Sequence, residues 1–85
     1  MPRFIFTRHL SDIVPRSIPV EGETVGKALE AVLIRYPRLQ SYLLDDQGQL
    51  RTHVRIFVDE TLMDTFDDPV TASSEVYVLQ ALSGG

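Results

Sequence analysis

The middle of the chain carries the clearest helical pattern in the sequence. From Val25 onward, apolar residues recur every three or four positions, as they do along one face of an α-helix. They are Val25, Ala28, Leu29, Val32, Leu33 and Tyr36. Thr24 stands where an N-cap hydroxyl would accept a bond from a free backbone N–H, and Pro37 cannot continue a helix. The pattern predicts one amphipathic helix over residues 24–35.

Segments with the two-residue period of a β-strand flank this helix. The predicted strands are Arg3–Arg8, Ser17–Val20, His53–Val58, Thr61–Asp64 and Glu75–Leu82. Between the helix and the third strand, Leu39–Leu44 is expected to form a short apolar turn. One helix beside a mixed sheet indicates an α+β two-layer fold. If the first and last strands are central parallel neighbours, the helix is the crossover that they require, which is the β-grasp arrangement.

The length and charge of the chain limit the number of domains that it can form and the kinds of partner that it can bind. With 85 residues, we expect a single domain over residues 1–82 and a flexible C-terminal tail over residues 83–85. The net charge is −4, and the eight lysines and arginines are scattered along the sequence. Nucleic acid and anionic membranes are therefore disfavoured as partners. The absence of cysteine excludes disulfides, thiolate metal sites and a cysteine nucleophile.

No part of the sequence predicts export or membrane insertion. No apolar run approaches the roughly 20 residues of a membrane span. The first ten residues are too short and too charged for a signal peptide. The expected location is the cytoplasm.

Candidate catalytic residues do not form a recognisable set. The two histidines, His9 and His53, lie far apart and lack metal-ligand spacing, so neither predicts a metal site. The adjacent carboxylates at 45–46 and 67–68 are typical of solvated turns. No phosphate-binding loop or Ser-His-Asp set is present. We therefore expect a protein that is not an enzyme and binds no cofactor or metal.

The end of the sequence is the remaining candidate for chemistry. The last predicted strand runs directly into Leu82, Ser83, Gly84 and Gly85. To react with ATP, a C-terminal carboxylate must enter a narrow channel in an activating enzyme. Glycine has no Cβ, so two terminal glycines can enter such a channel where other side chains would clash. A frayed glycine terminus without function is the alternative. The tail together with the β-grasp order of elements favours a reactive carboxylate at Gly85.

Three segments of the sequence resemble a known family. They are residues 23–29 (ETVGKAL), 50–58 (LRTHVRIFV) and 74–85 (SEVYVLQALSGG). The chain resembles, over nearly its whole length, the molybdopterin-synthase small subunit and thiamine sulfur-carrier family of ubiquitin-like proteins. It is most similar to the branch that includes the cysteine-biosynthesis sulfur carrier.

This resemblance implies a mechanism and a set of partners. An ATP-dependent, ubiquitin-activating-like enzyme would adenylate the Gly85 carboxylate, and a sulfur source would convert it to a thiocarboxylate. A sulfur-accepting biosynthetic enzyme would then use that sulfur. Gly84, Ser83 and Leu82 would form the threading tail, and ATP would be bound by the partner.

Two turns depart from the family pattern. Asp59-Glu60 replaces the usual Asn-Gly turn after the third strand, which implies a different turn type. Residues 72–74 (ASS) replace the usual Asp-Gly-Asp before the last strand, so this loop is expected to differ in shape. Neither change affects the expected role of Gly85.

The alternation of the strands also predicts a docking surface. If Val54, Ile56, Val58, Val76 and Val78 point to the core, the residues between them point to solvent. We expect Phe57, Tyr77 and Leu79 to form a partner-binding patch on the sheet face away from the helix. The alternative is that Phe57 and Tyr77 form only a stabilising cross-strand pair.

Three functions are compatible with these features. The first is a sulfur carrier, with cysteine or another small sulfur metabolite placed ahead of molybdopterin. The second is a ubiquitin-like modifier that is joined to lysines through Gly85. The third is a β-grasp interaction module whose tail is inert. The sequence does not distinguish the first two, because they share the activation chemistry.

Overall fold

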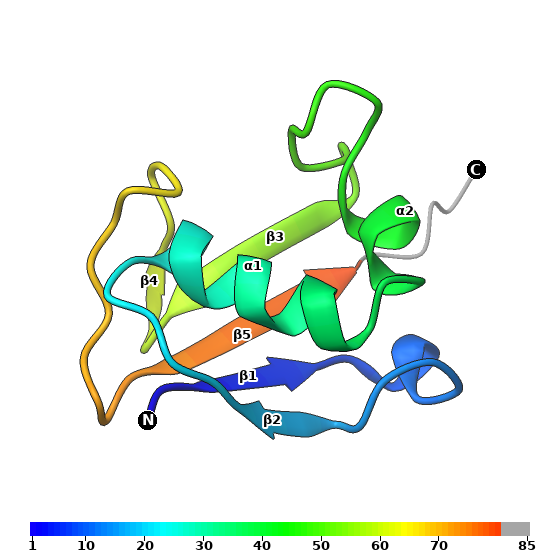
Figure 1. Ribbon diagram of the computed structural model, residues 1–85. Coiled ribbons are helices and arrows are strands. Elements are labelled where there is room, and N and C mark those ends of the chain that lie inside the picture. Colours follow the sequence, from blue (N-terminus) through cyan, green and yellow to red (C-terminus); the bar gives the residue numbers. More distant parts are fainter. Residues whose placement is uncertain (81–85) are drawn as a thin grey trace.

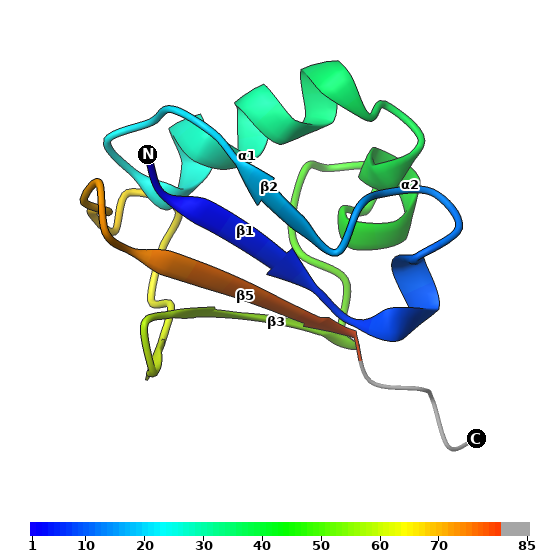
Figure 2. The ribbon, with the colours of Figure 1, turned by 90° about the horizontal axis from the view of Figure 1, so that it is seen from below.

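A five-stranded mixed sheet forms the centre of the structure, a computed structural model that describes residues 1–80 apart from the side chains of His9 and Gln80. The strands are β1 (Arg3–Phe6), β2 (Ser17–Pro19), β3 (Val54–Val58), β4 (Thr61–Leu62) and β5 (Glu75–Gln80). The helices are α1 (Val25–Arg35), α2 (Leu39–Leu43) and a 3₁₀ turn, η1 (Arg8–Leu10). Both α-helices lie on the same side of the sheet (Figures 1 and 2).

The first and last strands are neighbours at the centre of the sheet, as predicted. The strand order is β2-β1-β5-β3-β4, and Phe4 of β1 pairs with Val76 of β5 in a parallel ladder. The other strand pairs are antiparallel. Helix α1 lies between β1 and β5 in the sequence and covers one face of the sheet (Figure 1). The predicted β-grasp arrangement is confirmed.

The sequence pattern placed helix α1 correctly to within one residue. The Thr24 hydroxyl accepts a hydrogen bond from the Lys27 N–H at 3.1 Å, so Thr24 is the N-cap as predicted. Arg35 is the last helical residue, and Tyr36 leaves helical geometry before Pro37. With eleven residues, α1 is too short to cross a bilayer, and no other helix within residues 1–80 is long and apolar enough to do so.

Other elements differ from the prediction where turns compete with strand periodicity. Strand β1 ends at Phe6 instead of Arg8, because η1 turns the chain and buries Leu10. The apolar segment after Pro37 is the short helix α2, not a turn; its first and last residues are both buried. Strand β3 begins at Val54, whose N–H donates to the Arg51 carbonyl at 3.0 Å in the preceding turn. The predicted end of the last strand, residues 81 and 82, lies outside the described residues.

The core lies between α1 and the inner face of the sheet. Phe4 and Phe6 of β1 are buried there, with ring centroids 6.0 Å apart. Strands β1, β2, β3 and β5 contribute alternate residues to this face, as the two-residue period requires. The predicted inward residues of β3 and β5 are confirmed: Val54, Ile56, Val76 and Val78 are buried, and Val58 is partly buried against the core.

The turn after β3 depends on the unusual backbone of Asp59. Its φ of 51° lies in the left-handed region, which aspartate tolerates better than most residues. The Asp59 N–H donates to the Glu75 carbonyl at 2.8 Å, and the Asp59 Oδ1 accepts from the Glu75 N–H at 2.9 Å. The turn therefore adds two hydrogen bonds beyond the β3–β5 ladder, and one of them needs the aspartate side chain.

The segment before β5 closes on itself through Ser74. The Ser74 hydroxyl accepts from the Thr71 N–H at 2.9 Å, and the Ser74 N–H donates to the Thr71 carbonyl at 3.0 Å. Ser74 is buried, so these bonds satisfy polar groups that water does not reach. This turn replaces the Asp-Gly-Asp segment that the family resemblance implied.

Gly22 is required where the chain passes the first turns of α1. A Cβ at this position would lie 2.6 Å from the backbone nitrogen of Ala28 and 2.7 Å from its Cα. Only a shift of the helix could relieve this contact, because the obstacle is backbone. We expect Gly22→Ala to lower the free energy of unfolding by about 1–3 kcal/mol in urea titrations.

The matched control for this prediction is Gly48→Asn. A Cβ on Gly48 meets no atom within 4 Å, and asparagine tolerates its φ of 79°. We expect only a small change in the urea midpoint. Equal losses in both variants would show that the packing of Gly22 against α1 is not the cause.

Candidate functional site

The predicted reactive tail follows the central strand of the sheet. β5 is paired with β1 from Glu75 to Val78 and with β3 from Val76 to Gln80. Gln80, its last residue, pairs with Val54 at the start of β3. The predicted tail residues Leu82, Ser83, Gly84 and Gly85 lie outside the described residues. The described part of the site is thus the strand that precedes the tail. It is held by β1 and β3 up to Val78 and by β3 alone at Leu79 and Gln80.

The outer face of the sheet, away from α1, carries the three residues predicted for docking. Phe57 of β3 lies directly opposite Tyr77 of β5, so both side chains are on this face. Both are half-buried, whereas Leu79 is 42% exposed. The predicted orientation is confirmed, and the role of these residues in docking stays a prediction.

Two further apolar residues extend this surface. Ile5 of β1 pairs with Tyr77, and Leu62 of β4 pairs with Phe57, so a row of four side chains crosses the sheet. Leu62 is 53% exposed. The outer apolar patch consists of Ile5, Phe57, Leu62, Tyr77 and Leu79. The alternation of Ile5 with Phe4 and Phe6 could have indicated its outward direction, but β4 is too short to show a period.

Carboxylates border the outer apolar patch at the start of β5. The Tyr77 hydroxyl donates a hydrogen bond to the Glu75 Oε1 at 3.1 Å. This bond, and then the negative charge of Glu75, raise the pKa of the Tyr77 phenol above its usual value of 10.0. Desolvation and the charges of Glu60 and Asp59 add to the shift. Tyr77 is therefore a neutral hydrogen-bonding group at physiological pH.

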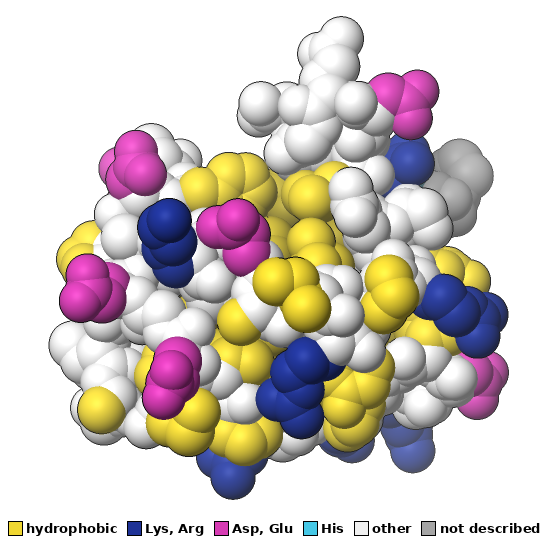
Figure 3. Space-filling view, in the orientation of Figure 1, with side chains coloured by type: hydrophobic (Ala, Val, Ile, Leu, Met, Phe, Trp, Pro, Cys, Tyr) yellow, Lys and Arg dark blue, Asp and Glu magenta, His cyan; other side chains and the backbone are white. Residues whose placement is uncertain are grey.

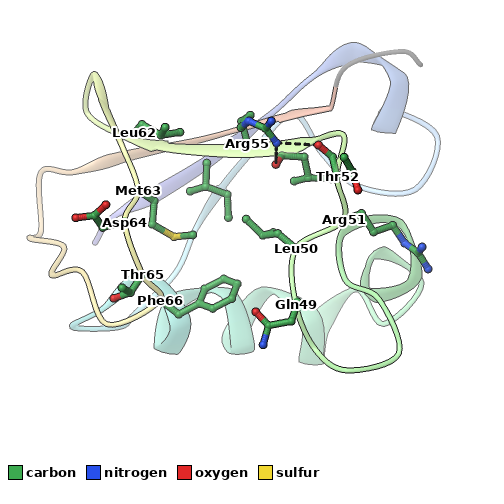
Figure 4. Close-up of a pocket in the computed structure, with 12 residues that line it drawn as sticks. Gln49, Leu50, Arg51, Thr52, Arg55, Leu62, Met63, Asp64, Thr65 and Phe66 are labelled. Carbon is green, nitrogen blue, oxygen red and sulfur yellow. Dashed lines mark hydrogen bonds between the residues drawn. The ribbon is translucent and has the colours of Figure 1, made fainter. Parts of the chain in front are cut away.

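A separate groove of about 530 Å³ lies on the helix side of β3 (Figure 4). Its apolar lining is Leu50, Val54, Ile56, Met63 and Phe66. The labelled polar side chains of Arg51 and Asp64 point away from it in Figure 4. Leu62 and Arg55 also line the groove, although their side chains point toward the other side of β3 in Figure 4. Within residues 1–80, this groove offers no converging set of reactive groups.

The carboxylates singled out in turns have local structural roles. Asp45 Oδ1 accepts from the N–H groups of Gln47 and Gln49 at 2.9 and 3.0 Å. Asp68 Oδ2 accepts from the Asp64 N–H at 2.8 Å. These bonds stabilise turns, as expected for aspartates in such positions. The described residues contain no cluster of three or more side chains that could hold a metal ion.

Sequence comparison identified no relative from which a function could be transferred. No family model matches the chain. No curated protein sequence matches it either.

Solved structures provide the comparison instead. SAMP1 of Haloferax volcanii, a small archaeal modifier protein, has a TM-score of 0.82 and 25% identity, with 99% of this chain and 98% of that chain covered. A chain of the Amycolatopsis orientalis BexX/CysO complex has a TM-score of 0.87 and 17% identity over 100% of both chains. A chain of the Helicobacter pylori molybdopterin-converting factor complex has a TM-score of 0.65 and 18% identity, covering 99% and 97%.

These similarities define the class of the protein. Its fold is the ubiquitin-like β-grasp, and the resemblance to the sulfur-carrier family drawn from the sequence is confirmed. One of the similar proteins is called a modifier, and two were solved in complexes with a second protein.

Proposed function

We propose that this protein is a sulfur carrier whose reacting group is the carboxylate of Gly85. The observation that carries the proposal is the position of β5, the central strand of a β-grasp sheet, which ends at Gln80 and is separated by one residue from the Leu82-Ser83-Gly84-Gly85 sequence. Such a strand gives the tail a fixed base, and the two glycines give it a narrow end. We place the protein in the cytoplasm, as a co-substrate of enzymes and not as a catalyst.

The proposed chemistry has two steps. A ubiquitin-activating-like partner binds ATP, and the Gly85 carboxylate oxygen attacks the α-phosphate, forming an acyl-adenylate and releasing pyrophosphate. A sulfur donor of the sulfide class then attacks the acyl carbon, and AMP leaves with the carboxylate oxygen that it had bonded. The product is a thiocarboxylate, which donates sulfur to a biosynthetic enzyme for cysteine, another sulfur metabolite or molybdopterin.

The test of this proposal is the intact mass of the protein after reaction. Incubation with the adenylating enzyme of the same organism, ATP and sulfide should replace one oxygen atom by sulfur. Tandem mass spectrometry should map the change to the C-terminal peptide. An unchanged mass would overturn the sulfur-carrier proposal and favour the inert module. The positive control is that the same enzyme preparation adenylates a second carrier protein that is known to be its substrate.

The modifier function is the second candidate, and the similarity to SAMP1 favours it. It shares the adenylation step but ends in an amide bond between Gly85 and a lysine of another protein. Peptides from cell extract that carry a branched Gly-Gly remnant on lysine, absent from cells lacking this protein, would support it. A thiocarboxylate without such conjugates would favour the carrier.

We further propose that the outer apolar patch docks on the adenylating enzyme. The patch adjoins the base of the tail, since Leu79 immediately precedes the last residue of β5. Its aromatic and aliphatic residues are of the kind that form interface cores. We expect Phe57→Ala and Leu79→Asp each to raise the KM for adenylation about 30-fold, which corresponds to about 2 kcal/mol.

The control for docking is Ile34→Asp. Ile34 is 80% exposed on α1, so this change introduces the same charge on the side of the molecule opposite the patch. We expect its KM to equal that of the unmodified protein. If Leu79→Asp and Ile34→Asp gave the same kinetics, the outer face would not be the docking surface, and Phe57 with Tyr77 would be only a stabilising pair.

A further inference from the structure

The fold brings half of the acidic residues and half of the basic residues together in two groups of opposite sign. Residues 59–75 contain six acidic residues and no lysine or arginine. The segments 7–16 and 51–55 together contain four arginines and one acidic residue, Asp12. Asp45 and Asp46, in the loop before the second segment, line a hollow together with Arg51. The four arginines, Arg8, Arg16, Arg51 and Arg55, form the arginine group. The net charge of −4 conceals this separation.

Strand register places the two groups at opposite ends of β5. Segment 7–16 joins the end of β1 to the start of β2, and the Phe6 N–H bonds to the Arg16 carbonyl at 2.8 Å. Arg55 pairs with Leu79. The arginine group therefore surrounds the end of the sheet where β5 finishes. Segment 59–75 runs from the end of β3 to Glu75, the first residue of β5, and acidic side chains lie mainly toward that end in Figure 3.

The two charged groups are far enough apart that a partner at one end of β5 interacts mainly with the charges at that end. A strand of six residues spans about 20 Å. The Debye length at physiological ionic strength is about 8 Å, so a partner at one end is largely screened from the charges at the other. The basic residues are scattered along the sequence, but strand register brings four of them to one end of the sheet.

Neutral oxygen atoms hold two of these arginines in place. The Arg55 guanidinium donates to the carbonyl oxygens of Thr52 and Val54 at 2.8 and 3.0 Å. The Arg51 Nε donates to the Ser41 carbonyl at 2.8 Å. These acceptors orient the guanidinium groups without neutralising their charge. A guanidinium group that is already oriented loses less conformational freedom when it meets an anion.

We propose that the arginine group docks on an acidic surface of the adenylating enzyme, around the opening that admits the tail; this inference rests on the proposed function. The arginines border the end of the strand that leads to Gly85. An acidic opening would attract them and repel the carboxylates of residues 59–75, so the protein would approach tail first. Charge complementarity of this kind raises association rates about 10- to 1,000-fold and decreases with salt.

A protein partner fits this surface better than a nucleic acid does. Leu79, an exposed member of the outer apolar patch, lies opposite Arg55, so apolar and cationic groups form one continuous surface. Interface cores rich in aromatic residues with arginine are typical of protein–protein contacts. A nucleic-acid site would instead need a basic face concentrated enough to contact several successive phosphates.

The experiment measures ATP–pyrophosphate exchange by the adenylating enzyme of the same organism at low and high salt. The tail-end double variant is Arg8→Glu/Arg55→Glu. The matched control is Arg3→Glu/Lys27→Glu, away from the arginine group; both doubles change the net charge from −4 to −8. We expect kcat/KM of the unmodified protein to fall about tenfold from about 20 to 300 mM NaCl. At low salt, the tail-end variant should lose about tenfold or more, and the control little.

The outcomes separate this inference from the proposed function. Absence of exchange with the unmodified protein would overturn the proposed function and this inference with it. Exchange that is independent of salt, or equally reduced in both doubles, would overturn only the acidic docking surface. Binding of a fluorescent single-stranded oligonucleotide at physiological salt, lost in the tail-end variant, would assign the arginines to nucleic acid and also overturn it. Melting curves check that both doubles fold.

Discussion

Deletion of Gly85 is expected to abolish thiocarboxylate formation completely while leaving thermal unfolding unchanged. The reaction needs the glycine carboxylate at the α-phosphate of ATP, and a tail shortened by one residue ends about 3.5 Å earlier. Addition of a residue after Gly85 should have the same effect, because it moves the carboxylate and places a side chain in the channel. Intact-mass spectrometry after incubation with enzyme, ATP and sulfide measures both results.

Gly84→Val should block the same reaction by a different route. A β-branched side chain adds bulk next to the reacting residue and restricts the backbone at that position. Ser83→Gly is the matched control, since it keeps the length of the tail and adds no side chain. We expect this control to react like the unmodified protein. Thiocarboxylate formation by the Gly85 deletion at the level of the unmodified protein would show that the Gly85 carboxylate is not the reacting group, and would overturn the proposal.

Leu29→Ala is expected to cost about 2–5 kcal/mol of the free energy of unfolding, a large share of the stability of a small domain. Leu29 is only 3% exposed and lies on the buried face of α1 with Val25, Ala28 and Val32. The loss combines the transfer energy of the removed atoms with the cavity that they leave. Urea titration of the two proteins measures it.

Ile34→Ala provides the control on the same helix. Ile34 is 80% exposed, so the same type of truncation removes no core contact. We expect a change within about 0.5 kcal/mol of zero, as for most surface substitutions. Equal midpoints for Leu29→Ala and the unmodified protein would mean that α1 does not bury the face that contains Leu29.

The parts of the fold that depend on local patterns could be predicted from the sequence. Helix α1 has a cap at Thr24, an apolar stripe and a stop at Pro37, and each acts within a few residues. The inward and outward faces of β3 and β5 followed from simple alternation, so Phe57, Tyr77 and Leu79 were placed correctly. The boundaries were less exact, because single hydrogen bonds such as that of Val54 to Arg51 decide where a strand begins.

The parts that depend on strand register could not be predicted in the same way. Leu62 joins the outer apolar patch only because it pairs with Phe57, and nothing in a two-residue strand specifies that pair. The arginine group is similar: Arg8 and Arg55 are 47 positions apart in the sequence, and the parallel pairing of β1 with β5 brings them to one end of the sheet. Such juxtapositions are properties of the topology.

The central position of β5 also has a consequence for the synthesis of the protein on the ribosome. Without β5, the pairs β1–β2 and β3–β4 have no strand to join them, because β5 separates β1 from β3. Isolated two-stranded pairs are marginal in water. The sheet can therefore close only after residues 75–80 have left the exit tunnel, and the pairing of β1 with β5 is a late, long-range event. A nascent chain that stalls before β5 would thus reach neither a stable core nor a folded base for its tail.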